Sequence, residues 1–275
     1  MADGPLKIES DKLLLIAGPC VIESAEQCFQ IAEHVMAAAE GLPVQYVFKA
    51  SFDKANRSSG SSFRGPGLDK GLAILRQVKD KLGLPVLSDI HEAEQAAPAA
   101  EVLDILQIPA FLARQTDLLE ACGKTGRTIN VKKGQFMAPA EMANAIAKIK
   151  SVGNENVLLC ERGTFFGYGR LVNDFTGLAV MKSLGRPVIF DVTHSTQQPA
   201  GQGTTSGGSP QFSPMLARAA IATGCVDGLF LECHPDPKNA KSDAATVLDM
   251  AIVGPLLKSL CQLHQMRPTW PEVRT

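Results

Sequence analysis

The chain lacks the features that mark membrane and secreted proteins. No apolar run approaches the roughly 18 residues needed to cross a bilayer, and the first residues, MADGPLKIESDK, lack a signal-peptide pattern. The seven cysteines are an odd number without disulfide-framework spacing. We therefore expect a cytoplasmic protein with free thiols and no membrane partner.

An excess of either charge is also missing. The 27 Lys and Arg residues nearly balance the 28 Asp and Glu residues, for a formal net charge of −1. Nucleic acid is therefore a poor candidate partner, and any binding of anions must come from local clusters. The chain of 275 residues is long enough to bury a substantial core, and no linker-like shift in composition divides it. These observations predict one domain over residues 1–275.

The sequence does contain a regular alternation of short apolar runs and longer amphipathic segments. The apolar runs are LLLIAG (13–18), VQYVFKA (44–50), PVLSDI (85–90), VLDILQIP (102–109), TINVKK (128–133), VLLCER (157–162), PVIFDVTH (187–194) and GLFLECH (228–234). Their continuous hydrophobicity is typical of strands buried on both faces of a parallel sheet. The segments between them, such as 24–40 with Ser24 as a helix cap, predict helices. Eight such alternations predict an α/β fold, a (β/α)8 TIM barrel.

A doubly wound open sheet is the main structural alternative. It predicts a glycine-rich phosphate-binding turn after the first strand. The chain has AGPCVIES there, without a G-x-G-x-x-G pattern, so the barrel is favoured. The segment GQGTTSGGSP (201–210) lies between the seventh strand and its helix, and it predicts a mobile loop at the active site.

Chemically active side chains follow the apolar runs, where a barrel of this kind carries its active site. In chain order they are Cys20, Lys49, Asp89, His91, Gln107, Lys132, Glu161, Arg162, His194 and Glu232. The segment FKASFDKANRSS after the second run adds Lys54 and Arg57, and Ser58 adds a hydroxyl donor. Cations that converge without a matching number of acids predict anionic ligands, either more than one phosphate or a phosphate and a carboxylate. The alternative is a solvated loop of mixed charge.

Closure of a barrel would also bring the first strand beside the eighth. Cys20, His194 and Glu232 would then be neighbours, and their thiolate, imidazole and carboxylate can bind Fe2+, Zn2+, Mn2+ or Co2+. Asp243, in the loop after the last strand, could supply a fourth ligand. The alternative interpretation is that Cys20 and His194 are ordinary core residues. Two competing ligands stay open at this point: Cys233 and His234.

Seven blocks of sequence resemble one known family over essentially the whole chain. They are IAGPCVIES, FKASFDKANRSS, PAFLARQTDLL, NVKKGQF, LCERGTFFGYG, FDVTHS and ECHPDPKNAKSDA. In these blocks the chain resembles the 3-deoxy-D-manno-octulosonate 8-phosphate synthases. The similar 3-deoxy-D-arabino-heptulosonate 7-phosphate synthases, which use erythrose 4-phosphate, usually have a proline-arginine-threonine-serine type motif where this chain has Asn56-Arg57-Ser58-Ser59. They are the alternative.

The resemblance implies a transferase that condenses phosphoenolpyruvate with D-arabinose 5-phosphate and releases phosphate, in lipopolysaccharide synthesis. It implies a homotetramer, because in the family Arg114 reaches the pentose phosphate of a neighbouring subunit. The substrate-binding residues that it implies are Lys49, Ser51, Lys54, Asn56, Arg57, Ser58, Asp89, Gln107, Arg114, Lys132 and Arg162. Of these, Lys54, Lys132 and Arg162 hold phosphoenolpyruvate, with Lys49 and Ser51 near its carboxylate.

The resemblance also bears on the metal. In the family a cysteine at the position of Cys20 marks the metal-dependent branch, and an asparagine marks the metal-free branch. Ser242-Asp243-Ala244 is also similar to the metal branch, which implies that Cys20, His194, Glu232 and Asp243 bind a divalent ion. The candidate catalytic residues are Lys54, Asn56, His91, Lys132, His194 and Asp243.

Two further functions are alternatives. A Schiff-base aldolase would use Lys132 or Lys49 as its nucleophile. A phosphosugar-binding barrel without catalytic activity would use the same cations, but would have no need of the ligand-type residues at its strand ends.

Overall fold

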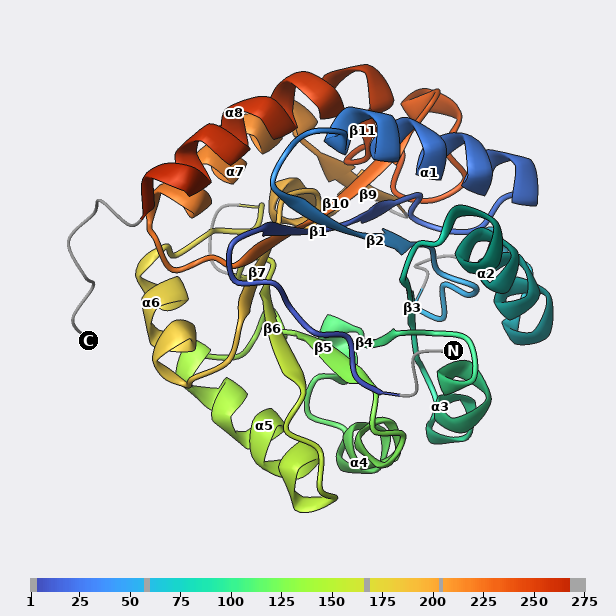
Figure 1. The fold of residues 1–275 in the computed structure, drawn as a ribbon, viewed down its shortest axis with the longest axis vertical. Helices are drawn as coiled ribbons and strands as arrows, with labels where there is room; N and C mark the ends of the chain where they lie inside the picture. Colours follow the sequence, from blue (N-terminus) through green and yellow to red (C-terminus); the bar gives the residue numbers. More distant parts are fainter. Residues whose placement is uncertain (1–3, 57–59, 166–168, 203–204, 268–275) are drawn as a thin grey trace.

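The computed structural model describes residues 4–56, 60–165, 169–202 and 205–267. Within these residues eight parallel strands form a closed barrel, with helices packed around it (Figure 1). The strands of the barrel are β1 (Leu13–Gly18), β2 (Val44–Lys49), β3 (Val86–Asp89), β4 (Ile105–Ile108), β5 (Thr128–Lys132), β6 (Val157–Glu161), β7 (Val188–Asp191) and β10 (Gly228–His234). β10 returns to pair with β1 in register from Leu14↔Gly228 to Gly18↔Glu232, so the predicted closure is confirmed.

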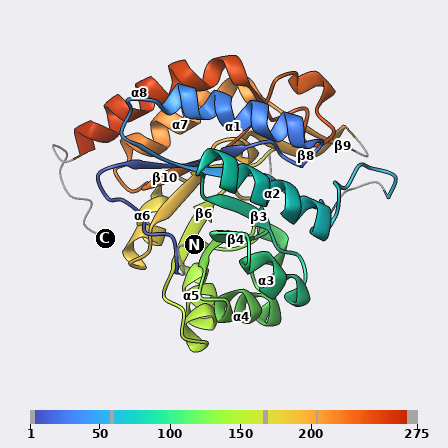
Figure 2. The same ribbon diagram turned by 45° about the vertical axis from the view of Figure 1, so that its right-hand side comes forward.

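Helices follow the barrel strands and cover them from outside, as Figure 2 shows from a second side. They are α1 (Ala25–Ala39), α2 (Leu68–Leu82), α3 (Ala93–Ala100), α4 (Thr116–Lys124), α5 (Met142–Ser151), α6 (Thr176–Ser183), α7 (Ser213–Ala222) and α8 (Val253–Met266). The expected cap of α1 is present, because Ser24 Oγ accepts the Gln27 N–H at 3.1 Å. None of the described helices is both long and apolar enough to cross a membrane.

Two strands are four residues shorter than the apolar runs that predicted them. β4 begins at Ile105. The preceding Asp104 donates its backbone N–H to the Val86 oxygen at 3.0 Å, and its carboxylate accepts from the Val86 N–H and from Lys79. β7 ends at Asp191, and His194–Thr196 form a short 3-10 helix beyond it. His194 therefore lies in the turn after β7 rather than on the strand.

The segment predicted as a mobile loop instead contributes to an antiparallel hairpin. Its strands are β8 (Gln197–Gln202) and β9 (Thr205–Gly208), with Gln197 opposite Gly208. Glycine lowers strand propensity, which hid the hairpin from sequence analysis. Here glycine serves close packing, since a Cβ on Gly208 would lie 2.5 Å from the backbone oxygen of Ala245. The hairpin thus lies against the loop that carries Asp243.

The apolar core has two layers. The larger layer fills the space between the strands and the helices. The smaller one lies inside the barrel and consists of Leu14, Ile16, Val47, Leu87, Ile105, Leu158, Cys160, Ile189 and Phe230. Leu6 and Ile8 pack against it, so the N-terminal segment closes the barrel at the amino ends of its strands. The interior is therefore a packed core rather than a channel.

The inward-facing residues change from apolar to polar toward the carboxyl ends of the strands. Because side chains alternate between the two faces of a strand, residues two apart share a face. Five strands show the change in one such step: Val47 to Lys49, Leu87 to Asp89, Ile105 to Gln107, Ile189 to Asp191, and Phe230 to Glu232. The barrel therefore places a buried polar layer directly on its inner apolar layer.

Candidate active site

A cavity of about 620 Å³ lies above this polar layer. Many of the predicted site residues line it: Lys54, Asn56, Asp89, His91, Gln107, Lys132, Arg162, His194, Glu232 and Asp243. They come from β2, β3, β4, β5, β6, β7 and β10 or from the loops that follow these strands. The strand ends thus meet at one site, as the barrel prediction requires.

Other predicted residues lie elsewhere. Lys49 and Ser51 are fully buried and lie behind the cavity wall. Arg114 is exposed, and with Lys148 it borders a different hollow on the outside of the barrel. Arg57 and Ser58 fall outside the described residues.

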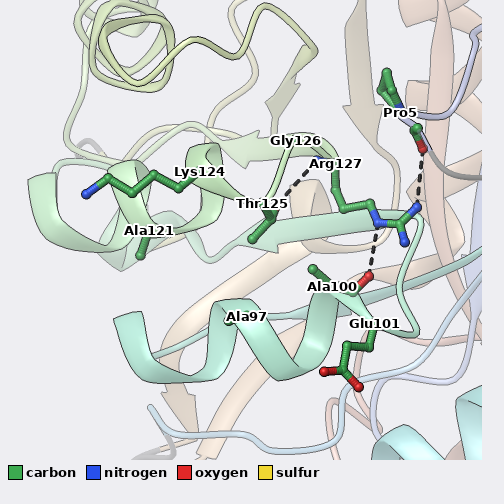
Figure 3. A pocket seen from close by; sticks show the side chains of 10 residues that line it. Pro5, Ala97, Ala100, Glu101, Ala121, Lys124, Thr125, Gly126 and Arg127 are labelled. Atoms are coloured by element: carbon green, nitrogen blue, oxygen red, sulfur yellow. Dashed lines mark hydrogen bonds between the residues drawn. The ribbon is translucent and has the colours of Figure 1, made fainter.

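A second hollow, of about 660 Å³, lies at the amino ends of β4 and β5, between α3 and α4 (Figure 3). Small apolar side chains form much of it. Arg127 donates there to the backbone oxygens of Ala100 at 3.0 Å and Gly4 at 3.3 Å, which ties the N-terminal segment to the barrel. The contacts of this hollow are architectural, so the chemistry belongs to the cavity at the carboxyl ends.

The expectation that the cations lack matching acids is wrong. Lys132 Nζ lies 2.7 Å from Asp191 Oδ2, and Lys54 Nζ lies 3.6 Å from Asp89 Oδ2. Lys49 pairs with Glu232, and it also donates to the backbone oxygen of Cys20 at 2.8 Å. An unpaired buried ammonium group would cost several kcal/mol, so each of these lysines has a carboxylate partner. Arg162 differs, because its guanidinium donates to the neutral amide oxygen of Gln197 at 2.7 Å.

The predicted metal ligands come together in space. Donor atoms of Cys20, Glu232 and Asp243 all lie within 4.8 Å of one another. Asp243 Oδ2 is 3.1 Å from Cys20 Sγ and 3.6 Å from His194 Nε2, and Glu232 Oε2 is 3.7 Å from the same nitrogen. Ligands of one tetrahedral ion at about 2.0–2.3 Å stand roughly 3.3–3.8 Å apart. Cys20, Glu232 and Asp243 are therefore already grouped as ligands of one ion would be. His194 Nε2 lies near both carboxylates but outside that group of three, so the imidazole would have to move to complete a four-ligand site.

The chemistry of these donors also fits a cation. Glu232 Oε2 is buried and accepts no hydrogen bond from the described residues. Burial raises the pKa of the Cys20 thiol well above its usual value, and the nearby carboxylates of Asp243 and Glu232 raise it further. A divalent ion would reverse this effect, because it stabilises the thiolate and the converging carboxylates.

Asp243 has an uncommon backbone conformation. Its φ of 52° lies in the left-handed region, and it is the only non-glycine residue with positive φ in the described part of the chain. Its backbone oxygen accepts from the N–H groups of Thr246 at 2.8 Å and Val247 at 3.0 Å, which hold the turn in place. The turn directs the carboxylate toward Cys20 and His194.

The two competing ligands lie away from the cluster at Cys20, for different reasons. Glu232 faces the barrel interior, so Cys233 faces outward, where it is fully buried in the layer between strands and helices. His234 lies at the end of β10 and contacts Gln27 at 2.7 Å and Glu23 at 3.4 Å. Neither residue joins the cluster at Cys20.

Asp191 is the most important site residue that sequence analysis missed. It is fully buried, and it accepts from Lys132 Nζ and from both the backbone N–H and the ring Nδ1 of His194. Burial alone lowers the pKa of His194, yet the Asp191 carboxylate reverses this and the pKa is raised. The signal was available, because Asp191 lies two residues after the inward-facing Ile189. Other missed residues line the cavity: Gln135, Gln197 and Lys241.

A separate network lies at the ends of β3 and β4. The Asp89 carboxylate accepts hydrogen bonds from Ser51 and Gln107, and Gln107 Oε1 accepts from Asn130 at 2.8 Å. Next to it, burial lowers the pKa of His91, and its Nδ1 has no partner among the described residues. A neutral imidazole at the cavity wall can accept a proton.

Comparison with known proteins places the chain in a family. The pattern of the DAHP synthetase I family matches residues 6–268. The chain belongs to this family. A family relative from Geobacter sulfurreducens is 55% identical over 258 residues, covering 94% of each chain. Another, from Syntrophotalea carbinolica, is 57% identical over 246 residues, covering 90% of this chain and 88% of the relative. Both relatives bear the name 2-dehydro-3-deoxyphosphooctonate aldolase.

Proposed function

We propose that the chain condenses phosphoenolpyruvate with D-arabinose 5-phosphate to give 3-deoxy-D-manno-octulosonate 8-phosphate and phosphate. The name of the relatives denotes the synthase that the sequence blocks resemble, which favours this activity over heptulosonate synthesis. The observation that carries the proposal is the cavity itself. Cations suited to phosphoenolpyruvate and ligands suited to a divalent ion face the same cavity at the carboxyl ends of the strands.

Lys54, Lys132 and Arg162 form the proposed phosphoenolpyruvate site. Arg162 presents a planar guanidinium whose only described side-chain partner is a neutral amide, so it can bind carboxylate or phosphate oxygens at two points. Lys132 Nζ lies over the Phe230 ring, 3.6 Å from its centroid, which limits its freedom. Phosphoenolpyruvate and arabinose 5-phosphate are both anions and must approach each other here. Alignment of the two reactants lowers the reaction barrier by up to about 7–11 kcal/mol in favourable cases.

The charge states of Lys132 and Lys54 do not support a Schiff-base mechanism at either residue. Burial alone lowers the pKa of Lys132, but the Asp191 carboxylate outweighs it and the pKa is raised. The pKa of Lys54 is raised well above its usual value, again against the effect of burial, by Cys20 and Asp89 among others. A Schiff-base lysine needs a lowered pKa. We expect no borohydride-trapped adduct on the protein.

Cys20, His194, Glu232 and Asp243 would hold a divalent ion, Fe2+, Zn2+, Mn2+ or Co2+. When bound, the ion supplies Lewis acidity toward the aldehyde or the attacking water. The side chains of the chain itself orient the reactants, and His91, whose pKa is lowered by burial, lies at the cavity wall, where its imidazole can accept a proton. Asp89 keeps Lys54 and Gln107 in position beside it.

The pentose phosphate would bind nearer the mouth, at Asn56 and at residues of the same loop. Asn56 is exposed at the cavity edge. The homotetramer is supported by apolar side chains near this mouth, because Phe111, Phe136 and Phe165 expose 50%, 46% and 41% of their surface. Arg114 lies three residues after Phe111, so a neighbouring subunit docked here could present it to the pentose phosphate.

The direct test is release of phosphate from phosphoenolpyruvate by the purified protein. We expect release with arabinose 5-phosphate and much less with erythrose 4-phosphate. A chelator should stop the reaction, and Mn2+ or Co2+ should restore it. Equal rates with both sugars would contradict the substrate assignment, and a rate that survives complete removal of metal would contradict the role of the ion.

A further inference from the structure

One carboxylate contacts both halves of the proposed site. Asp191 Oδ2 is 2.7 Å from Lys132 Nζ, which belongs to the phosphoenolpyruvate half, and 2.8 Å from Nδ1 of His194, which belongs to the metal half. Its second oxygen accepts the backbone N–H of His194 at 2.9 Å. Asp191 has no exposed surface, so solvent cannot replace either contact.

The contact with His194 fixes how the ring meets the ion. A carboxylate is only an acceptor, so Nδ1 carries the proton, and Nε2, which lies near Glu232 and Asp243, is the nitrogen left to bind an ion. A carboxylate behind a ligating imidazole also makes the imidazole a stronger donor, and loss of such partners typically weakens metal binding about 10–100-fold. The strength of this effect depends on how much negative charge Asp191 keeps for the ring.

The contact with Lys132 sets how much of the negative charge of Asp191 acts on the His194 ring. While the ammonium group rests against Asp191, it neutralises part of the carboxylate's charge. An anionic oxygen of phosphoenolpyruvate would draw on the same ammonium group and leave more of the carboxylate's charge to the imidazole.

We propose that Asp191 couples the two halves of the site, so that phosphoenolpyruvate and the divalent ion each strengthen the binding of the other. This inference rests on the proposed function. The coupling is reciprocal, and a typical coupling of this kind changes affinity by about 5–150-fold. Asp191 acts as a positioning residue, since it contacts the two binding groups and lies behind them.

The test measures the Kd of Mn2+ by calorimetry, with and without saturating phosphoenolpyruvate, for the native protein, Asp191→Asn and Asp89→Asn. Asp89 is the matched control, because it is also a buried carboxylate beside a cavity lysine, yet it contacts Lys54 and Gln107 rather than His194. Both variants lose one negative charge, so a purely long-range effect would change both alike. Asp89→Asn should bind phosphoenolpyruvate more weakly, because it loses the partner of Lys54. At a concentration that saturates each protein, however, we expect phosphoenolpyruvate to tighten Mn2+ about tenfold in both the native protein and Asp89→Asn. In Asp191→Asn that ratio should fall to about twofold, as only direct attraction between the ligands remains.

An equal ratio in the two variants would overturn the coupling. A native protein that binds neither Mn2+ nor phosphoenolpyruvate would instead overturn the proposed function. A second measurement needs no variant. In metal-free protein labelled with 15N-histidine, phosphoenolpyruvate should shift the Nδ1 resonance of His194, and an unchanged resonance at saturation would contradict the shared contact.

Discussion

The barrel interior has a lower apolar layer and an upper polar layer, and the same strands build both. The lower layer contributes stability, and the upper layer contributes the chemistry of the site. In the lower layer, residues such as Ile189 and Phe230 form a small apolar core inside the ring of strands. One step further along the same face, Asp191 and Glu232 are as completely buried as the core below them. The comparison shows how the fold separates stability from chemistry by a spacing of two residues.

Burial of the charged side chains of the upper layer costs free energy, and neighbouring side chains offset this cost. Its charges are arranged as pairs, Lys49 with Glu232 and Lys132 with Asp191, and these pairs rest on the lower layer through Phe230. Close approach of the backbones is needed as well. A Cβ on Gly18 would lie only 1.9 Å from the backbone oxygen of Lys49, so no other residue fits beside this pair.

The largest effect should come from a metal ligand in the upper layer. Cys20→Asn removes the thiolate, and we expect the affinity for Mn2+ to fall more than about 100-fold and phosphate release to fall about 10²–10⁴-fold. Metal content after dialysis and the rate of phosphate release measure the two effects. Cys233→Ser is the control, because that thiol faces the helices; it should keep its metal. Undiminished metal content in Cys20→Asn would remove Cys20 from the ligand set.

The next effect comes from a broken pair behind the site. Lys49→Met leaves Glu232 buried without its counter-charge, which should lower the free energy of unfolding of the metal-free protein by about 3–5 kcal/mol. A divalent ion bound by Glu232 replaces part of that charge, so the loss should shrink when Mn2+ is added. Urea unfolding with and without Mn2+ provides the measurement. A loss of the same size in both conditions would show that the ion does not replace the charge of Lys49 beside Glu232, which contradicts the prediction.

A change in the lower layer should alter stability and leave chemistry intact. Ile189→Val removes one buried methyl group two residues before Asp191, at an expected cost of about 0.5–1.5 kcal/mol. Phosphate release per folded molecule should stay within about twofold of native, because the polar layer keeps its contacts. A large fall in the rate with little change in stability would show that the two layers are not separable.

The smallest expected effect is on how the free energy of unfolding depends on pH. Burial alone would raise the pKa of Asp89, but Lys54 and other cations lower it well below its usual value. Such a group stabilises the fold fully above its unfolded pKa of about 3.9, and this stability is lost as the pH falls toward the lower folded value. The unfolding free energy should therefore fall less steeply below pH 4 in Asp89→Asn than in the native protein. Parallel urea titrations between about pH 5 and pH 3 measure the difference, and equal slopes would show that Asp89 is not held ionised.

The sequence predicted the barrel, its closure and most of the cavity residues, because these follow from periodicity and from the position of strand ends. Asp191 was missed because the seventh apolar run was taken to end at His194, and the strand stops three residues earlier. The partners of Lys49 and Lys132 could not be seen, since they come from strands distant in sequence. The 197–208 hairpin was hidden by its glycines, whose role depends on what they pack against.

The most direct test of the account is anomalous diffraction from crystals grown with Mn2+. The account predicts one anomalous peak about 2.0–2.4 Å from donor atoms of Cys20, His194, Glu232 and Asp243, with the Asp191 carboxylate behind the imidazole. A peak bound by Cys233 or His234, or no peak at the end of β1 in a protein that releases phosphate at full rate, would contradict it.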